Sequence, residues 1–347
     1  MFIKIGNKKI GKNYPVFIIA EAGINYNNNL RLAYKMVDNA VAAKADAIKF
    51  QTFVTEDIQL KNSTKPKYQR KIKNKTYFQI LKENEPLFDD HARIAKYCKK
   101  KKIIFLSTAA DKRSADFLEK IGVPAFKIGA LDLSNHILLE YLAKKRKPLL
   151  ISTGISTMKL VSSTVNLIKK HKMKNNLILL QTNSDYPSPN EDVNLRVIPE
   201  YKKKFNVLVG LSDHTQDHTA CLGAVALGAC VLEKHFTLNK KLPGVDQKIS
   251  LEPHEFKELV EKVRLMEKSL GSNKKFVTKS EKENLSMRKK LVIKPSQKGT
   301  IITLDLLDAK RGNKEGILPI EENIEKILRR KLRKNILKEK QFSWDMI

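Results

Sequence analysis

The chain has 347 residues, enough for a large core and a small second domain. Hydrophobic residues make up 41% and charged residues 30%, which is typical of a globular protein, and no apolar run approaches the roughly 20 residues that span a bilayer. The formal net charge of +30 is spread over nearly every predicted helix, without one basic stripe interleaved with aromatic residues, so we expect a lysine-rich surface and no nucleic-acid partner.

The N-terminus carries no apolar stretch of the kind found in signal peptides, and we therefore expect a cytoplasmic location. The three cysteines, Cys98, Cys221 and Cys230, contain no CxxC pair. Two of them lie in or beside apolar runs, and Cys98 lies in a helical pattern. Buried, reduced thiols are the prediction.

From the N-terminus to about residue 270, short apolar runs alternate with amphipathic stretches of helical spacing. The runs predict eight strands: Val16–Ala20, Ala47–Phe50, Ile103–Leu106, Ala125–Ile128, Pro148–Ile151, Leu177–Leu180, Val207–Leu211 and Val231–Glu233. The clearest predicted helices are Leu30–Ala43, Asp90–Lys100, Ser114–Ile121, Ser134–Ala143, Lys159–His171, Ala220–Leu227 and Pro253–Ser269.

Eight such units predict an α/β fold of the TIM type, a closed (β/α)8 barrel over residues 1–270. An open sheet that binds a dinucleotide would need a GxGxxG turn after its first strand, and Glu21–Asn25 is not one. The stretch 62–87 is long for one connection, and we expect it to form a lid over the barrel mouth.

Residues 271–284 are polar and contain Gly-Ser-Asn, which predicts a linker. Residues 285–347 carry short strand-like pieces, Leu291–Ile293 and Thr300–Thr303. A unit of this size buries little apolar surface by itself, so we expect it to pack against the barrel or against another subunit.

Active sites of α/β barrels lie at the carboxyl ends of the strands. Here every predicted strand is followed by polar or ionisable residues: Glu21; Lys49 and Gln51; Ser107 and Thr108; Lys127; Ser152 and Thr153; Thr182 to Tyr186; Ser212 to His214; and Glu233 to His235. Loops are polar as a rule, but a lysine at the end of a buried strand needs an anionic partner. This end of the barrel is therefore the predicted active site.

Lys49 and Lys127 are expected to face one cavity. Two ammonium groups, together with the hydroxyls of Ser152, Ser184 and Ser212, suit a phosphate or a phosphate plus a carboxylate. The alternative for each lysine is a salt bridge to a neighbouring carboxylate such as Asp46 or Asp132.

His214 and His235 end two successive predicted strands, so their neutral imidazoles can reach one shared metal ion. We expect a divalent metal, foremost Mn²⁺ with Mg²⁺ or Co²⁺ as alternatives, because no cysteine or third histidine favours zinc. His218 begins the next predicted helix and is not expected to be a ligand. His91, His171 and His254 fall on or beside predicted helices, where we expect them to be solvated, and His136 begins a helix.

These residues predict a metal-dependent barrel enzyme that acts on a phosphate-bearing acid. A Lewis acid beside a phosphate pocket suits carbon–carbon bond formation at a carbonyl, and it also suits hydrolytic release of phosphate.

The chain also resembles the N-acetylneuraminate (sialic acid) synthases and related nonulosonate synthases. The resemblance is carried by motifs in order along the whole chain: Ala20–Asn25, Lys49–Thr52, Phe105–Thr108, Phe126–Gly129, Ser152–Ser156, Tyr186-Pro187, Gly210–Thr215, Leu232–Thr237 and Gly244–Asp246. In the tail, Lys310-Arg311-Gly312 and Trp344–Met346 resemble the small antifreeze-like (SAF, β-clip) domain of that family.

This resemblance implies that phosphoenolpyruvate and an N-acylated aminohexose, N-acetylmannosamine or a similar sugar, condense to a nine-carbon 2-keto acid with release of phosphate. It implies that Glu21, Lys49, His214 and His235 are catalytic and that the metal on the two histidines polarises the sugar aldehyde. The implied phosphoenolpyruvate contacts are Lys49, Thr108, Lys127, Ser152, Ser184 and Ser212. The implied sugar contacts are Gln51, Asp132, Tyr186, Asp246 and Arg311.

By the same resemblance, Arg311 reaches into the site of a partner subunit and meets the N-acetyl group, which requires a domain-swapped homodimer. The chain departs from the family pattern at Ala130-Leu131-Asp132, where a serine and a glutamate are common. It also departs at Tyr26, Val245 and Gln247, where the family commonly has histidine, proline and histidine.

These departures leave the sugar open, so a legionaminic or pseudaminic acid synthase that uses a 2,4-diacetamido-6-deoxyhexose is the alternative. A barrel enzyme acting on an aldose phosphate would need an arginine cluster that the strand ends lack. A basic binding protein without catalysis is the alternative from another class.

Overall fold

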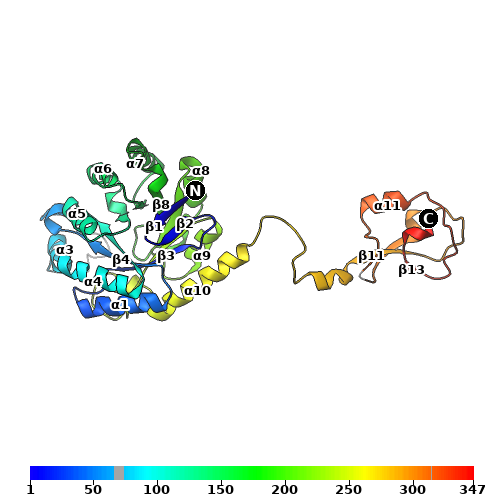
Figure 1. Ribbon diagram of the computed structural model, residues 1–347, viewed down its shortest axis with the longest axis horizontal. Helices are drawn as coiled ribbons and strands as arrows, with labels where there is room; N and C mark the ends of the chain where they lie inside the picture. Colours follow the sequence, from blue (N-terminus) through cyan, green and yellow to red (C-terminus); the bar gives the residue numbers. More distant parts are fainter. Residues whose placement is uncertain (66–73, 314) are drawn as a thin grey trace. The chain divides into compact units, whose positions relative to one another are not determined.

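The computed structural model describes residues 1–65, 74–313 and 315–347 of the chain. Two compact units are present, Met1–Gly271 and Ser272–Ile347 (Figure 1). Residues 66–73, within the segment predicted as a lid, lie outside the described residues. The described part of that segment includes the short helix α3, Tyr77–Asn84.

The first unit is a closed barrel of eight parallel strands, as predicted. Neighbouring strands follow one another in sequence, and β10 closes the ring by pairing with β3. The strands are β3 Phe17–Gly23, β4 Ala47–Thr52, β5 Ile104–Ala109, β6 Phe126–Ile128, β7 Leu149–Ser152, β8 Leu177–Thr182, β9 Leu208–Asp213 and β10 Val231–His235.

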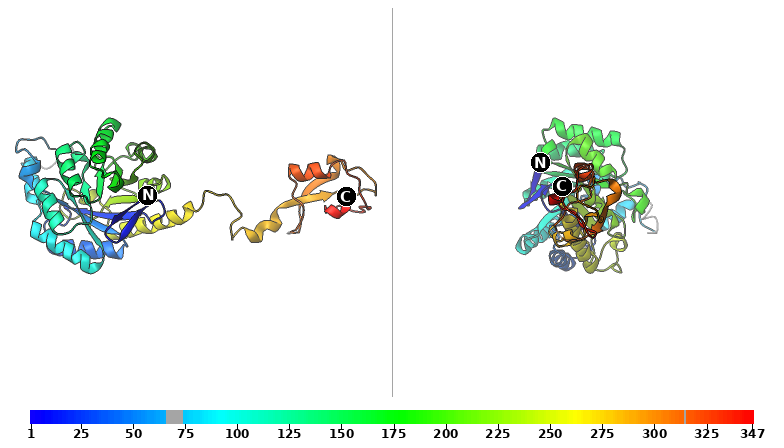
Figure 2. Two further views of the ribbon diagram at one scale, coloured as in Figure 1. Left: turned by 45° about the horizontal axis from the view of Figure 1, so that its top comes forward. Right: turned by 90° about the vertical axis from the view of Figure 1, so that its right-hand side faces the viewer.

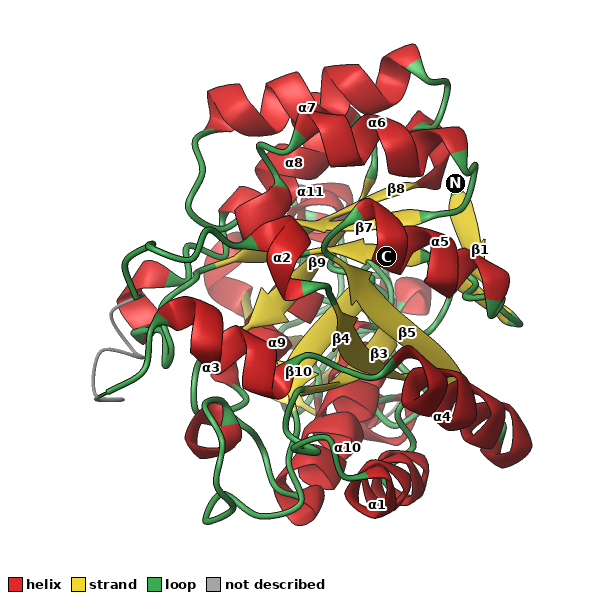
Figure 3. Ribbon diagram, turned by 90° about the vertical axis from the view of Figure 1, so that its left-hand side faces the viewer, coloured by secondary structure: helices red, strands yellow, loops and turns green. Residues whose placement is uncertain are grey.

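Helices surround the strands (Figure 3). They are α1 Leu30–Ala42, α2 Thr55–Ile58, α4 Phe88–Lys101, α5 Lys112–Lys120, α6 His136–Lys144, α7 Met158–Lys170, α8 Val197–Phe205, α9 Thr219–Ala226 and α10 Pro253–Leu270. Their ends follow local chemistry: Asn29 caps α1 by accepting from two backbone amides, and Glu252 and Glu255 form a capping box at α10. Among the described residues, no helix has the length and apolar character that crossing a membrane requires.

Side chains alternate between the two faces of each barrel strand, and this alternation positions the site. The lower half of the interior is filled by one apolar cluster that includes Phe17, Ala47, Leu106 and Ile178. Residues of opposite parity, such as Ile18 and Ile48, join a second cluster with the surrounding helices. Two positions further along each inward row, near the carboxyl ends, the residues become polar, and there the site begins.

A short antiparallel hairpin adds three residues to the interior cluster. It pairs β1, Phe2–Ile5, with β2, Lys8–Gly11. Ile3, Ile5 and Ile10 belong to the same cluster as the lower interior residues. Since these residues pack at the opposite end of the rows from the polar side chains, the hairpin closes the base of the barrel and leaves the carboxyl end for chemistry.

His91 was expected to be solvated, and that expectation is wrong. The imidazole is fully buried on α4. Its Nε2 lies 3.1 Å from the Tyr26 hydroxyl and its Nδ1 lies 2.9 Å from Thr52 Oγ1, which in turn lies 2.7 Å from Ser107 Oγ. A chain of polar partners therefore satisfies His91 and links α4 to the ends of β4 and β5.

The second unit has its own core. An antiparallel sheet places β11, Lys289–Ile293, between β12, Leu307–Arg311, and β13, Lys340–Gln341. Helix α11, Glu321–Ile327, contributes Ile327 to an apolar cluster with Leu291, Ile293 and Phe342. Figure 2 shows the ribbon of this unit from two further directions. The tail is thus a small folded domain with an antiparallel sheet.

His91 should make the stability of the barrel sensitive to acid. Burial lowers the pKa of His91 to about 3, whereas an unfolded histidine has a pKa near 6.5. The neutral form therefore stabilises the fold above pH 6.5, and this contribution is lost as the pH falls from 6.5 toward 3, by about 1.4 kcal/mol per pH unit. We expect His91→Gln to lower the thermal midpoint at pH 8 and to narrow its gap to the wild type at pH 5.

Thermal unfolding followed by circular dichroism between pH 8 and 5 measures this gap. His254→Gln, which removes an exposed imidazole on α10, is the matched control and should track the wild type. Parallel midpoint curves for wild type and His91→Gln would contradict the assignment of a neutral, buried imidazole.

Candidate functional site

Lys49 lies at the centre of the polar layer. It points inward from β4 and is 2% exposed. Its Nζ lies 2.8 Å from Glu21 Oε2 on β3 and donates to Thr108 Oγ1 on β5 at 3.0 Å. A third neighbour, Glu233 Oε1 on β10, lies 3.6 Å away. Three separate strands therefore hold one ammonium group at the barrel mouth.

Lys127, on β6, faces the same interior. Its Nζ donates to Ser152 Oγ on β7 at 2.8 Å and lies 3.7 Å from the same oxygen of Glu233. That oxygen also accepts from Ser212 Oγ at 3.0 Å, while the other carboxylate oxygen of Glu233 is buried without a hydrogen-bond partner. Glu233 is thus a shared counter-ion between two buried lysines, and its bonding capacity is not used up.

Burial and mutual charge set the ionisation of this cluster. Burial raises the pKa of Glu21 to about 7, although the Lys49 ammonium pulls it down. Burial by itself would lower the pKa of Lys49, but the Glu21 and Glu233 carboxylates raise it above its usual value. For Lys127 burial prevails and lowers the pKa to about 8. Near neutral pH, Glu21 and Lys127 can therefore each take up or release a proton.

His214 and His235 lie beside this cluster with ring centroids 5.3 Å apart. His214 Nδ1 lies 2.5 Å from the Asn183 carbonyl oxygen, which can only accept, so this nitrogen carries the proton and Nε2 keeps its lone pair. Burial lowers the pKa of His214 to about 4 and that of His235 well below its usual value. Both imidazoles are therefore neutral at physiological pH.

Neutral imidazoles with free lone pairs are the state that binds a metal ion. His235 Nδ1 is buried and has no hydrogen-bond partner, so this ring also has unused bonding capacity. The described residues contain no cluster of three or more histidine, cysteine or carboxylate groups suited to a metal. An ion held here would take two protein nitrogens, and oxygen ligands from water or substrate would complete its shell.

Three predicted site residues, Glu21, Gln51 and Asp246, meet around Gly23 at the end of β3. Gln51 Nε2 donates to Glu21 Oε1 at 3.1 Å. A Cβ at Gly23, whose φ is +52°, would lie 3.3 Å from Gln51 Nε2, 3.4 Å from Glu21 Oε1 and 3.9 Å from Asp246 Oδ2. Glycine therefore leaves room for the three side chains to converge. Asp246 is 8% exposed, and burial raises its pKa to about 6.

A buried polar web supports Asp246 from behind. Gln247 is fully buried; it donates to the Asn25 carbonyl at 2.9 Å and also bonds Thr237. Asn25 donates to Ser250 Oγ at 2.9 Å, and Ser250 donates to the backbone carbonyl of Asp246 at 2.6 Å. Gln247 thus fixes the loop that carries Asp246.

Asp132 and Ser184 lie in neighbouring loops of the mouth. Asp132 lies on a 3-10 helix over Ala130–Asp132, with Oδ2 3.9 Å from where a Cβ on Gly129 would lie, and burial raises its pKa to about 6. The Ser184 hydroxyl is buried without a partner and occupies the space that a Cβ on Gly154 would need. The Ser184 hydroxyl therefore has bonding capacity left for a ligand.

The remaining predicted sugar contacts lie in different units. The ring of Tyr186 packs against His214, 4.2 Å between centroids, and meets His235 edge-on at 5.9 Å. Tyr186 therefore forms one wall beside the two histidines. Arg311 ends β12 in the second unit and is exposed.

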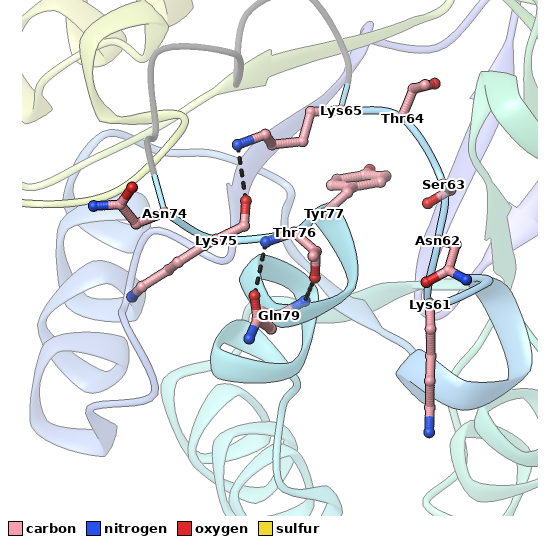
Figure 4. A pocket seen from close by; sticks show the side chains of 10 residues that line it. All are labelled: Lys61, Asn62, Ser63, Thr64, Lys65, Asn74, Lys75, Thr76, Tyr77 and Gln79. Atoms are coloured by element: carbon pink, nitrogen blue, oxygen red, sulfur yellow. Dashed lines mark hydrogen bonds between the residues drawn. The ribbon is translucent and has the colours of Figure 1, made fainter.

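Two cavities accompany the mouth. One of about 760 Å³ is lined by the segment before and within α3: Lys61, Asn62, Ser63, Thr64, Lys65, Asn74, Lys75, Thr76, Tyr77 and Gln79 (Figure 4). Burial, followed by the nearby charge of Asp246, raises the pKa of Tyr77, so Tyr77 lies within electrostatic reach of Asp246. The other cavity, about 550 Å³, includes Ser184, Gln181 and Tyr201 in its lining.

The structure adds two residues to which sequence analysis gave no specific role. Glu233 was seen only as a polar residue at a strand end, although it has the same parity along β10 as His235 and so had to face the same cavity. Asn183 acts through its backbone carbonyl, which accepts the hydrogen bond from His214 Nδ1. A backbone contact of this kind leaves no trace in residue type.

Comparison with known proteins gives concordant matches. The profile of the NeuB family matches residues 36–275. The chain is 35% identical to the N,N'-diacetyllegionaminic acid synthase of Legionella pneumophila over 355 aligned positions, covering 99% of this chain and 97% of that protein. It is 37% identical to the human N-acetylneuraminate-9-phosphate synthase, covering 89% and 87%.

Among solved structures, the sialic acid synthetase of Leptospira borgpetersenii, solved with citrate, superposes with a TM-score of 0.74 at 36% identity. The match covers 83% of this chain and 96% of that one.

Asp246 should destabilise the barrel at alkaline pH. Its carboxyl has a pKa near 6 in the fold against an ordinary value of 3.8, so the protonated form is favoured by folding and stability is lost as the pH rises from 3.8 through 6. The full penalty, about 3 kcal/mol at most, applies above pH 6. We expect Asp246→Asn to raise the thermal midpoint at pH 8 by several degrees and to lose that advantage near pH 4.

Differential scanning calorimetry at the two pH values tests this expectation. Asp192→Asn, at an exposed carboxylate, is the control and should change little. A midpoint of Asp246→Asn at or below the wild type at pH 8 would mean that Asp246 has a stabilising partner in the fold.

Proposed function

Because the chain belongs to the NeuB family, we propose that it condenses phosphoenolpyruvate with an N-acylated aminohexose to a nine-carbon 2-keto sugar acid and releases phosphate. The observation that carries the proposal is the pair of buried ammonium groups, Lys49 and Lys127, which share Glu233 at the barrel mouth beside two neutral histidines. N-acetylmannosamine is the first candidate sugar, and a 2,4-diacetamido-6-deoxyhexose is the second.

Lys49 and Lys127 bind the phosphate and carboxylate of phosphoenolpyruvate. The hydroxyls of Ser152 and Ser212 already point at the lysines or at their counter-ion, which supports a role as further donors. Thr108 and Ser184 complete the donor set. Since the incoming anion competes with Glu233 for both lysines, Glu233 keeps the site neutral until substrate arrives.

Two properties of His214 and His235 support a bound divalent metal, for which Mn²⁺ is the first candidate and Mg²⁺ and Co²⁺ are alternatives. The rings are neutral, and at least one buried ring nitrogen lacks a partner. When bound, the ion would supply Lewis acidity toward the sugar aldehyde. Asn183 fixes the tautomer of His214 that this role needs.

Glu21 handles protons and orients water at the reacting carbon. Its carboxyl has a pKa of about 7, so both protonation states are populated near neutral pH, as a general acid–base group requires. Lys49 and Gln51 each hold one of its oxygens, which fixes the carboxyl plane. In the reaction, C3 of phosphoenolpyruvate bonds to the aldehyde carbon and water adds at C2. The two protons of that water go to the new hydroxyl and to the departing phosphate, which leaves with the bridging oxygen as the C2–O bond breaks and C2 becomes a ketone.

The sugar lies on the side of Gln51, Asp246, Asp132 and Tyr186. Two of these are carboxylates that burial leaves with raised pKa values, so they gain from hydrogen bonds with sugar hydroxyl or amide groups. Asp132 is one methylene shorter than the glutamate common in the family. The added space beside it favours including the bulkier diacetamido sugar among the substrates tested.

Phosphate release from phosphoenolpyruvate tests the proposal. We expect release that depends on Mn²⁺ and on one member of a panel containing N-acetylmannosamine, its 6-phosphate and 2,4-diacetamido-6-deoxyhexoses. Chelator should stop it, and His235→Ala should abolish it and weaken Mn²⁺ binding. An active His235→Ala variant without metal would overturn the metal assignment.

If no sugar of the panel gives phosphate release, and the affinity for DNA falls steeply with rising salt concentration, a basic binding protein is favoured instead.

Arg311 gives a second test, because we propose that it enters the site of the other subunit in a domain-swapped dimer and contacts the N-acyl group. Arg311→Ala should raise the sugar KM about tenfold or more while changing the phosphoenolpyruvate KM little. Lys310→Ala is the matched control: Lys310 is the preceding residue of β12, and its Nζ lies 2.5 Å from Glu339 Oε1. An unchanged sugar KM would remove Arg311 from the site.

Mixing Arg311→Ala, which is weakened, with His235→Ala, which is inactive, tests whether the arginine acts between subunits when the sugar is kept well below its wild-type KM. In a swapped dimer, Arg311→Ala and His235→Ala chains refolded together form mixed dimers in which one site has both intact residues. Equal mixing should then restore about a quarter of wild-type activity. No restoration, although mixed dimers form, would mean that Arg311 acts within its own chain.

A further inference from the structure

The carboxyl ends of β9 and β10 form three successive cross-strand rungs. In the first, Ser212 and Glu233 face the interior and bond each other. In the second, Asp213 pairs with Lys234, and both side chains point outward, toward the helices. The third rung is the two histidines, which face inward again. Along the strands, the outer pair therefore comes between the Ser212–Glu233 rung and the predicted metal ligands, on the opposite face.

The outer rung, Asp213 with Lys234, is a buried ion pair, and both side chains make further hydrogen bonds. Lys234 Nζ lies 2.6 Å from Asp213 Oδ2, and each side chain is 1% exposed. The same Asp213 oxygen accepts from Thr215 Oγ1 at 3.1 Å and from Cys221 Sγ, on α9, at 3.3 Å. The other oxygen accepts from the Thr215 amide at 3.0 Å. Strand, loop and helix thus converge on one carboxylate.

The ammonium group also holds the loop that follows His214. Lys234 Nζ donates to the Thr215 carbonyl at 2.5 Å and to the Asp217 carbonyl at 3.0 Å. The loop therefore wraps around a cation that belongs to the neighbouring strand. His214 is the residue between Asp213 and this loop, so its backbone is clamped on both sides, and its carbonyl accepts from the Ser188 amide at 3.0 Å.

We propose that Asp213 and Lys234 are positioning residues that hold the imidazoles of His214 and His235 at the separation at which both bind one divalent metal ion. The proposal rests on the metal assignment of the proposed function. Each histidine is covalently next to one member of the pair, so any slip between the strand ends would move the two rings apart.

A role in stability alone would not call for charges here. On β9 and β10 the other outward residues, Val209, Leu211 and Leu232, are apolar and belong to the cluster packed against the helices. Replacing a buried ion pair by apolar residues is often neutral or stabilising, because removing two charges from water is costly. A charged pair adds a defined geometry, because the Lys234 ammonium reaches Asp213 and the carbonyls of Thr215 and Asp217 from one position.

The affinity for Mn²⁺ reports how well the two histidines are positioned, and its measurement does not depend on catalysis. We expect Lys234→Met, which keeps the side-chain length but removes the donors, to weaken Mn²⁺ binding about 10- to 100-fold, the range for residues that support metal ligands. Binding of Mn²⁺ alone is followed by loss of the free-ion signal in electron paramagnetic resonance, with circular dichroism on the same samples. Lys234→Arg, which keeps the charge, should recover part of the affinity.

The control is a comparable ion pair away from the metal ligands. Asp46 precedes β4, is 10% exposed, and lies 3.1 Å from Arg264 Nη2 and 2.8 Å from Lys8 Nζ. Asp46→Asn should lower the thermal midpoint but leave the Mn²⁺ affinity as in the wild type. Wild-type affinity in folded Lys234→Met would overturn the proposal.

If Lys234→Met does not fold, Asp213→Asn and Thr215→Val replace it. Asp213→Asn removes the carboxylate charge, and Thr215→Val removes the hydroxyl that bonds both Asp213 and Lys234. Both change the shape little, and both should weaken Mn²⁺ binding at least severalfold. Wild-type affinity in both would refute the positioning role. Failure of the metal assignment gives a different pattern, because the wild-type protein itself would then bind no more Mn²⁺ than His235→Ala.

Discussion

The structure depends on the need to balance two ammonium groups inside a closed barrel. Lys49 and Lys127 are almost fully buried, and an unpaired charge at such a position would cost several kcal/mol. Glu21 and Glu233 meet that need from the two strands that close the ring, β3 and β10. The balance is not complete: one Glu233 oxygen has no hydrogen-bond partner, and Glu21 and Lys127 have pKa values shifted toward neutrality. A cluster held this way keeps unused bonding capacity, which is what the proposed exchange of an internal carboxylate for a substrate anion requires.

Side chains alternate between the inner and the outer face of the barrel strands, so the two faces have different roles. On β9 and β10 the inward positions carry the carboxylate and the imidazoles, while the intervening outward positions carry the ion pair of Asp213 and Lys234. On β4 and β5 the outward positions Thr52 and Ser107 bond one another and His91, behind the inward Lys49 and Thr108. In both places, polar support on the outer face stands directly behind polar chemistry on the inner face. Preorganisation of this kind comes from hydrogen bonds that no substrate touches.

The sequence was sufficient to predict the barrel, because eight apolar runs followed by polar residues leave few other topologies. It was also sufficient to predict which residues would converge, since the carboxyl ends of parallel strands meet at one edge of the barrel. It did not predict the environment of His91, although His91, Ile94 and Cys98 recur at helical spacing and all three are buried. On α4 the helical spacing of the buried residues determines the position of His91, whereas the polarity of its imidazole by itself indicates exposure. The hairpin of β1 and β2 was missed because each strand has only four residues, although Ile3 and Ile5 alternate. The hydrogen bond to the Asn183 carbonyl and the contacts of Glu233 with both lysines can be found only from interatomic distances, because residue types do not specify them.

The structure also narrows where sugar selectivity can reside. Of the departures from the family pattern, Tyr26 is buried and bonds His91, so it faces α4 and not the mouth. Gln247 is buried as well, with its amide spent on the Asn25 carbonyl and on Thr237, so it shapes the loop under Asp246 without reaching a ligand. Asp132 is different, because it lies on the 3-10 helix that follows β6 and is only partly enclosed. A shortened acidic side chain at that place changes the volume and the reach of the wall itself. Under the proposed function, residue 132 is therefore the departure that can contact a sugar directly, while positions 26 and 247 act only through the residues they support.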